Sequence, residues 1–281
     1  MPVRIVTDSA ASLPAEVRQV HGITVIPLHV LFGATDCLED QDLSAKEFYR
    51  QLESRPEHPT TSQPTPAAFL EAYRSLEGDD PIVSLHVSGA LSGTIASARQ
   101  AAAQLPEREI HVVDSRTVSM SLGLLALEAA RAAEEGADAA SVVARVEEMA
   151  RRTYLAFVVQ TLEYLRRGGR IGGAQAFLGS LLNVKPVLHV SDGRVEPLTR
   201  ARSLAKACRA VLSHVREVAP AGIEHVALLH ADSDANRALL EAEVLDHVSP
   251  SGEVFRDVIM GPVIGVHVGR GSVGFAFTAR P

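Results

Sequence analysis

Residues 82–104 read IVSLHVSGALSGTIASARQAAAQ, and this stretch decides the fold. The apolar run at 82–87 predicts a buried strand, and the pattern at 91–104 predicts a helix. The small and hydroxyl residues at 88–94 form the turn between them. A strand that passes through a short turn into a helix is the repeating unit of a largely parallel sheet.

The same alternation runs through the first half of the chain. It predicts an α/β domain with a Rossmann-like, largely parallel layer over residues 1–160. The predicted strands are 3–7, 23–32, 82–87 and 110–113, and the predicted helices are 14–20, 44–53, 66–76, 91–104, 121–135 and 138–152.

The second half has a different pattern. A strand at 155–160 is followed by a glycine-rich stretch at 166–173, which suits a crossover between domains. We expect an α+β domain with an antiparallel or mixed sheet over 161–281, and we expect the segment near 60–66 to be free to pack on it. The predicted elements are a hairpin of 186–190 with 194–198, helices at 203–218 and 234–247, and strands at 226–230, 254–259 and 272–278.

Composition excludes several classes of protein. The 281 residues include 27 basic and 34 acidic side chains, so the net charge of −7 disfavours nucleic acid and anionic lipid surfaces as partners. The chain has no apolar run of about 18 residues, no signal-peptide pattern and only two cysteines, which predicts a cytoplasmic protein. With no Trp and 4% aromatic residues, its core and any pocket must be mainly aliphatic.

Three hydroxyl-rich turns are candidate binding sites, at 7–9, 60–64 and 88–94. Ligands of open parallel sheets gather at the carboxyl ends of strands, where helix N-termini offer free N–H groups. Ser88 and Ser92 can equally be helix caps, and both readings stay open. Residues 60–62 are three consecutive hydroxyl residues, more than a cap requires.

The sequence lacks the motifs of several common enzyme and metal sites, and it offers a few single residues as candidate ligand contacts. The 88–94 loop has no Walker lysine, no serine has the hydrolase-elbow context, and no histidine set has zinc-ligand spacing, so neither a cofactor nor a metal is expected. His267 lies in the glycine-rich run 261–271, where a strand would bury it and the glycines suggest a nearby ligand or domain contact. Arg200 and Arg202 are either exposed charges or an anion clamp.

Taken together, these motifs resemble one family, the DegV proteins, also known as FakB-type fatty-acid-binding proteins. The resemblance extends along the whole chain. The matching motifs are Val6-Thr7-Asp8-Ser9-Ala10, Thr61-Ser62-Gln63-Pro64, Leu91-Ser92-Gly93-Thr94, Val113-Asp114-Ser115, Gly168-Gly169-Arg170-Ile171, Lys185-Pro186-Val187-Leu188 and Gly261-Pro262-Val263-Ile264-Gly265 with His267.

The resemblance implies a non-catalytic protein that binds one long-chain fatty acid. It implies that Thr61 and Ser92 contact the carboxylate, that Arg202 and His267 lie near it, and that Ser62 and Ser88 are secondary candidates. It also implies a partner, an ATP-dependent fatty acid kinase that makes acyl phosphate for phospholipid synthesis.

Two positions depart from the family pattern. Gly89 stands where a second hydroxyl is usual, and Arg270 stands where proline is common. Two other readings of the chain stay open, an enzyme that acts on a small anionic metabolite at the 88–94 loop and a lipid-responsive regulator.

Overall fold

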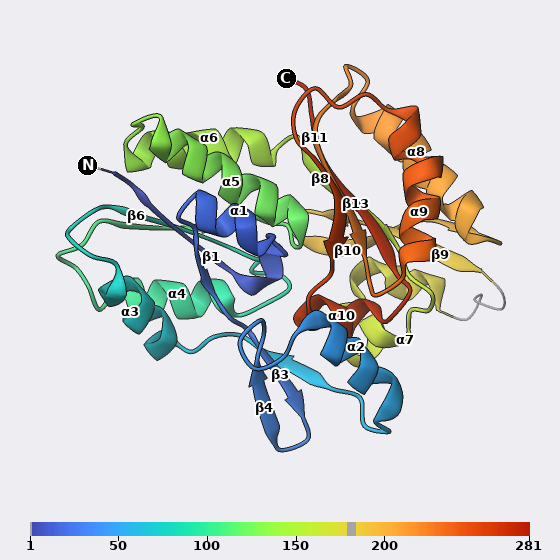
Figure 1. The fold of residues 1–281 in the computed structure, drawn as a ribbon, viewed down its shortest axis with the longest axis horizontal. Helices are drawn as coiled ribbons and strands as arrows, with labels where there is room; N and C mark the ends of the chain where they lie inside the picture. Colours follow the sequence, from blue (N-terminus) through green and yellow to red (C-terminus); the bar gives the residue numbers. More distant parts are fainter. Residues whose placement is uncertain (1, 179–183) are drawn as a thin grey trace.

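The computed structural model describes residues 2–178 and 184–281 and contains two main sheets with a smaller third one (Figure 1). The first sheet has four parallel strands in the order β2-β1-β6-β7. This confirms the predicted parallel layer. Its strands are β1 (Arg4–Asp8), β2 (Thr24–Ile26), β6 (Ile82–His86) and β7 (Ile110–Asp114).

Helices cover both faces of the parallel sheet. The pair α3 (Pro66–Ser75) and α4 (Thr94–Ala102) packs on one face, and Phe69, Tyr73 and Ala98 form a separate core there. The pair α5 (Met120–Glu134) and α6 (Ala139–Ala150) packs on the other face. This arrangement is the doubly covered α/β layer that the alternating sequence pattern predicts.

The second sheet is mixed, as predicted, and has the order β10-β9-β8-β13-β11-β12. Only β11 and β12 are parallel within it, and α8 (Leu204–Val218) and α9 (Asp234–Glu243) cover its outer face. Its strands are β8 (Thr153–Val158), β9 (Lys185–Ser191), β10 (Arg194–Ala201), β11 (Ile223–His230), β12 (Val254–Ile259) and β13 (Val273–Ala279).

The largest core cluster lies between the two main sheets and joins them. Helix α5 contacts β1 and β6 of the first sheet and β8, β11 and β13 of the second. The largest core cluster accordingly joins α5 residues such as Leu125 to Leu155 and Leu229 of the mixed sheet. The predicted domain boundary near residue 160 falls after β8, although β8 pairs with β9 and β13. The division of the chain into two domains stays a prediction.

The third sheet corrects one prediction. Residues 23–32 form two strands in different sheets, β2 and β3 (His29–Phe32), rather than one. Pro27 lies between them and has no N–H to continue a ladder. Strand β3 pairs with β4 (Thr35–Leu38) and β5 (Thr60–Ser62), both too short and polar to be recognised from the sequence.

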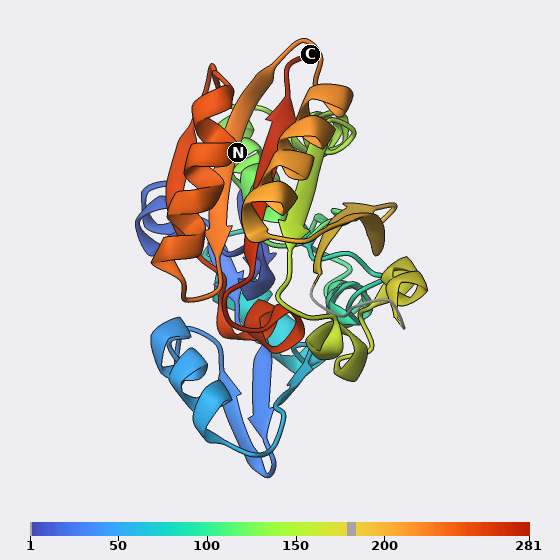
Figure 2. The same ribbon diagram turned by 90° about the vertical axis from the view of Figure 1, so that its right-hand side faces the viewer.

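A second correction concerns the run around His267. Residues Pro262–Val268 form helix α10 instead of a strand, with proline at the first helical position. Figures 1 and 2 show α10 above the third sheet and α2 (Ala45–Ser54). The remaining short elements are helices α1 (Ala15–Val20) and α7 (Glu163–Arg167) and the 3₁₀ turns η1 (Ser9–Ala11), η2 (Gly172–Phe177) and η3 (Leu245–His247).

Within residues 2–178 and 184–281, every helix is too short or too polar to span a bilayer.

Candidate functional site

A largely apolar cavity of about 830 Å³, including the part open to solvent, lies where the two main sheets meet α10. Side chains from both halves of the chain line it. The apolar ones are Ala10, Leu28, Val87, Leu91, Val118, Leu155, Phe157, Leu165, Val190, Val195, Leu229, Met260, Val263, Ile264 and Val268.

The cavity lining also contains polar side chains from the predicted binding motifs. The segment 61–63 and the loop with Ser92 are in contact at the cavity wall, where the side chain of Gln63 lies against Gly93. A Cβ on Gly93 would come within 2.9 Å of Gln63 Nε2, so glycine allows the close approach. The polar lining residues are Thr61, Ser62, Gln63, Ser92, Ser119, Arg170 and His267.

A hydrogen bond of 2.9 Å joins Thr61 Oγ1 to His267 Nε2, so β5 and α10 are linked at the cavity wall. Burial above all, together with the nearby Arg170 and His58, lowers the pKa of His267 to about 3. The imidazole is therefore neutral at physiological pH. Its Nδ1 atom has no hydrogen-bond partner and lies against the backbone of Gly168, where any side chain would collide with the ring.

Ser92 serves the local turn as well as lining the cavity. Its Oγ lies 2.8 Å from Thr94 Oγ1 and accepts a hydrogen bond of 3.3 Å from Thr94 N. Helix α4 begins at Thr94 with Gly93 as its N-cap residue, so the predicted start at Leu91 was three residues early. The Ser92 hydroxyl therefore bonds within the turn before α4 rather than capping the helix, and the same residue lines the cavity.

The hydroxyl cluster at 60–62 is not a helix cap. These residues form β5, and the cap of α3 is Thr65, whose Oγ1 accepts a hydrogen bond of 3.2 Å from Ala68 N. Thr61 is half-buried, whereas Ser62 and Gln63 are exposed while still lining the cavity. Their exposure places the 61–63 side of the cavity next to solvent.

Arg170 is a cavity-lining residue that the sequence reasoning did not select. Its guanidinium donates to Leu91 O through Nε at 2.9 Å and to Gly168 O through Nη1 at 2.7 Å. Two backbone carbonyls thereby hold a positive charge beside the Ser92 loop and His267. The signal was present, because Arg170 stands inside one of the motifs that carry the family resemblance.

Two of the predicted site residues lie elsewhere. Ser88 is buried outside the cavity lining, and its Oγ donates a hydrogen bond of 2.8 Å to Gly193 O, which ties the 88–94 loop to the β9–β10 hairpin. Arg202 is exposed just before α8 and does not line the cavity. The structure therefore brings together Thr61, Ser62, Ser92 and His267, but neither Ser88 nor Arg202.

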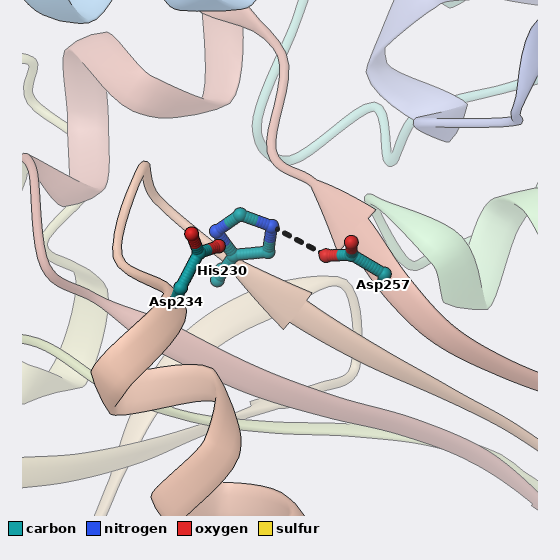
Figure 3. A group of neighbouring side chains, drawn as sticks. All are labelled: His230, Asp234 and Asp257. Carbon is teal, nitrogen blue, oxygen red and sulfur yellow. Dashed lines mark ion pairs between the residues drawn. The ribbon is translucent and has the colours of Figure 1, made fainter.

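In the part of the chain that the structure describes, one cluster of a histidine and two carboxylates could hold a metal cation. Figure 3 shows His230 between the exposed Asp234 and Asp257, with ligand atoms within 4.8 Å of one another. His230 Nδ1 accepts a hydrogen bond from Ser233 N at 3.2 Å, and Nε2 lies 2.9 Å from Asp257 Oδ1. Arg237 Nε is 3.4 Å from the same carboxylate oxygen. Hydrogen bonds and ion pairs thus engage His230 and Asp257 within this group.

The fold and the site define a two-sheet α/β protein with a mostly apolar internal cavity and polar side chains from four separate motifs on its lining. Comparison with known proteins identifies the family. The DegV family model matches residues 2–280, and the chain belongs to that family.

Individual relatives agree over the full length. A DegV domain-containing protein of Deinococcus radiodurans is 41% identical over 280 residues, which cover 98% of each chain. The structure of a fatty-acid-binding DegV family protein from Thermus thermophilus superimposes with a TM-score of 0.93 at 38% identity. DegV of Bacillus subtilis, a fatty acid binding protein, gives 0.90 at 33% identity, and both structures cover 100% of each chain.

Proposed function

We propose that this protein binds one long-chain fatty acid, with the acyl chain in the cavity and the carboxylate against its polar lining. The observation that carries the proposal is the cavity itself, whose walls are aliphatic except at the motif residues around Thr61 and Ser92. The fatty acid binding of the Thermus thermophilus and Bacillus subtilis relatives supports the same ligand class.

The apolar walls supply the driving force for binding. Burial of about fifteen methylene groups at ~0.8 kcal/mol each contributes on the order of 12 kcal/mol before the ordering of the ligand is subtracted. Burial of an unpaired carboxylate would cost several kcal/mol, so the head group needs donors. Thr61, Ser92 and the guanidinium of Arg170 are the donors at hand.

The hydrogen bond between His267 and Thr61 prepares the Thr61 hydroxyl for this role. With the proton of the neutral imidazole on Nε2, His267 donates to Thr61 Oγ1, and only the lone pair of Nδ1 is left against Gly168. The Thr61 O–H is then available to donate to the carboxylate. The other tautomer would consume that proton and leave a buried N–H without an acceptor.

We further propose that the protein presents this carboxylate to a separate fatty acid kinase in the cytoplasm. The kinase would transfer the γ-phosphoryl group of ATP to a carboxylate oxygen, which yields acyl phosphate for phospholipid synthesis and ADP. Thr61 and Ser92 hold an oxygen less tightly than a bidentate arginine does, and Arg170 already donates through Nε and Nη1 to backbone carbonyls, so a carboxylate oxygen can act as the nucleophile. The exposed Ser62 and Gln63 place that side of the cavity within reach of a partner.

Calorimetric titration of the delipidated protein tests the binding proposal. Palmitate should bind with submicromolar Kd, while hexadecanol, which lacks the carboxylate, and butyrate, which lacks the chain, should bind at least about tenfold more weakly. If butyrate or a small phosphorylated metabolite binds as tightly as palmitate, the enzyme reading of the 88–94 loop is favoured instead. Trapping of acyl phosphate as hydroxamate, with an added fatty acid kinase and ATP, tests presentation.

A further inference from the structure

Glu39 is a buried acid that none of the preceding roles uses. It follows β4, is 1% exposed, and lies between η1 and the first turn of α10. Its Oε1 accepts a hydrogen bond of 2.9 Å from Val263 N, and its Oε2 shares a hydrogen bond with Ser9 Oγ. Ser9 Oγ in turn accepts from Leu28 N at 2.9 Å.

This side chain supplies the cap that α10 lacks in its own sequence. The N-cap residue of α10 is Gly261, which has no side chain to bond the free N–H groups of the first turn. The Glu39 carboxyl occupies that space, and a Cβ on Gly261 would collide with its Oε1. The Glu39 carboxyl can therefore reach the first turn of α10 only because residue 261 is a glycine.

The third sheet holds α10 at both ends. Glu39, at the end of β4, bonds the first turn, and Thr61, in β5, bonds His267 in the last turn. Strands β4 and β5 flank β3 in the same sheet, so the two attachment points are fixed relative to each other. Four side chains of α10 line the cavity: Val263, Ile264, His267 and Val268.

We infer that Glu39 is a positioning residue for His267, and that its cap on α10 sets the hydrogen bond that prepares Thr61 for the ligand carboxylate. The claim that this arrangement prepares Thr61 for a carboxylate rests on the proposed fatty acid binding. The claim that Glu39 positions His267 does not. The neutral form of the side chain suffices for this role. Burial raises the pKa of Glu39 to about 8, so an uncharged carbonyl oxygen accepts from Val263 N much of the time near neutral pH.

The test compares three substitutions at this position by NMR of the ¹⁵N-labelled imidazoles in the ligand-free protein. In the wild type His267 stays neutral down to a pKa of about 3. Glu39→Ala and Glu39→Asp, which remove or shorten the acceptor, should move this pKa toward the ordinary value of 6.5 as α10 loosens. Glu39→Gln keeps an uncharged acceptor of the same length and should titrate as the wild type does. The Asp variant keeps the test valid if Glu39→Ala fails to fold.

Palmitate affinity is the second measurement. Glu39→Ala should bind palmitate about five- to tenfold more weakly, the scale of a lost helix cap, and Glu39→Gln should stay within about twofold of the wild type. Asp138→Ala is the matched control, because it removes the acidic cap of α6, whose residues do not line the cavity. It should lower stability without changing affinity.

The outcomes separate the two claims. A folded Glu39→Ala protein with unchanged His267 titration would overturn the inference, as would a Glu39→Gln protein that behaves like Glu39→Ala. If His267 responds as expected but wild-type protein takes up no palmitate, the positioning role stands and the proposed fatty acid binding fails.

Discussion

The hydrogen bond between Thr61 and His267 joins residues 206 positions apart in the chain, and it lies on the wall of the cavity. The hydroxyl-rich segment 60–64 and the glycine-rich run with His267 thus face one cavity. Only the family resemblance implied that the two segments lie near one ligand; local patterns could not show it, because their approach depends on β5 joining a sheet that was not predicted.

The paired variant Thr61→Val with Ser92→Ala tests the head-group assignment. We expect Kd for palmitate to rise at least about tenfold, since a hydrogen bond to a charged group contributes about 1.5–3 kcal/mol. Fluorescent fatty acid displacement measures the change. Thr60→Val, on the exposed face of the same strand, serves as the control and should bind normally. Wild-type affinity in the paired variant would show that the carboxylate lies elsewhere.

The depressed pKa of His267 predicts how stability depends on pH. Between pH 3 and 6.5 the unfolded chain binds a proton at this residue and the folded chain does not, so the free energy of unfolding falls as the pH falls through this window. The contribution of this one proton is about 1.4 kcal/mol per pH unit. Urea unfolding at pH 4, 5 and 6 should give a shallower slope for His267→Gln by this amount. Equal slopes would mean that His267 is not buried in its neutral form.

The arginine near the site shows the limit of reasoning from residue type. The family resemblance implies Arg202 as the arginine near the head group, yet Arg202 is exposed and outside the cavity lining. Arg170 lies on the lining because Leu91 O and Gly168 O fold around its guanidinium. The hydrogen bond to Leu91 O, 79 positions away, leaves no local pattern, so only the family motif at 168–171 pointed to Arg170.

At the scale of elements, most strands and helices of the two main sheets follow their hydrophobic patterns, and prediction succeeded there except at β2. It failed where the pattern was short or mixed. Strands β4 and β5 have few apolar residues, and α10 is a short apolar run with glycine at its N-cap, inside it and at its C-cap, which gives no helical pattern. Packing on α2, β3 and η1 stabilises α10 instead, and local propensity does not reveal such contacts.

The contact between α10 and α2 yields a prediction at this scale. A Cβ on Gly265 would collide with the ring of Phe48 and come within 2.9 Å of the Tyr49 hydroxyl. Gly265→Ala should therefore lower the free energy of unfolding by about 1–3 kcal/mol, measured by urea unfolding.

A double-mutant cycle with Phe48→Leu provides the control, since the smaller side chain makes room for the added methyl group. The cost of Gly265→Ala should shrink in that background. An equal cost in both backgrounds would show that α10 does not pack on Phe48 as described.

At the scale of the whole molecule, the aliphatic composition matches the apolar cavity that opens beside the core shared by the two sheets. Helix α5 contacts both main sheets, and the cavity opens where those sheets meet α10. A protein without Trp and with 4% aromatic residues can line such a space with Val, Leu and Ile. The net charge of −7 means that an anionic ligand must be held by local donors rather than by the overall field.

The central claim is that this cavity holds a long-chain fatty acid, and its most direct test is to identify what the purified protein carries. Protein expressed in bacteria and purified without detergent is denatured, extracted with organic solvent and analysed by mass spectrometry. Ile264→Trp, which fills the cavity from α10, is the comparison, with thermal melting to confirm that it folds. We predict about one long-chain fatty acid per wild-type chain and a several-fold loss in the filled variant. A wild-type protein that yields no fatty acid, and takes up none when palmitate is added, would contradict the account.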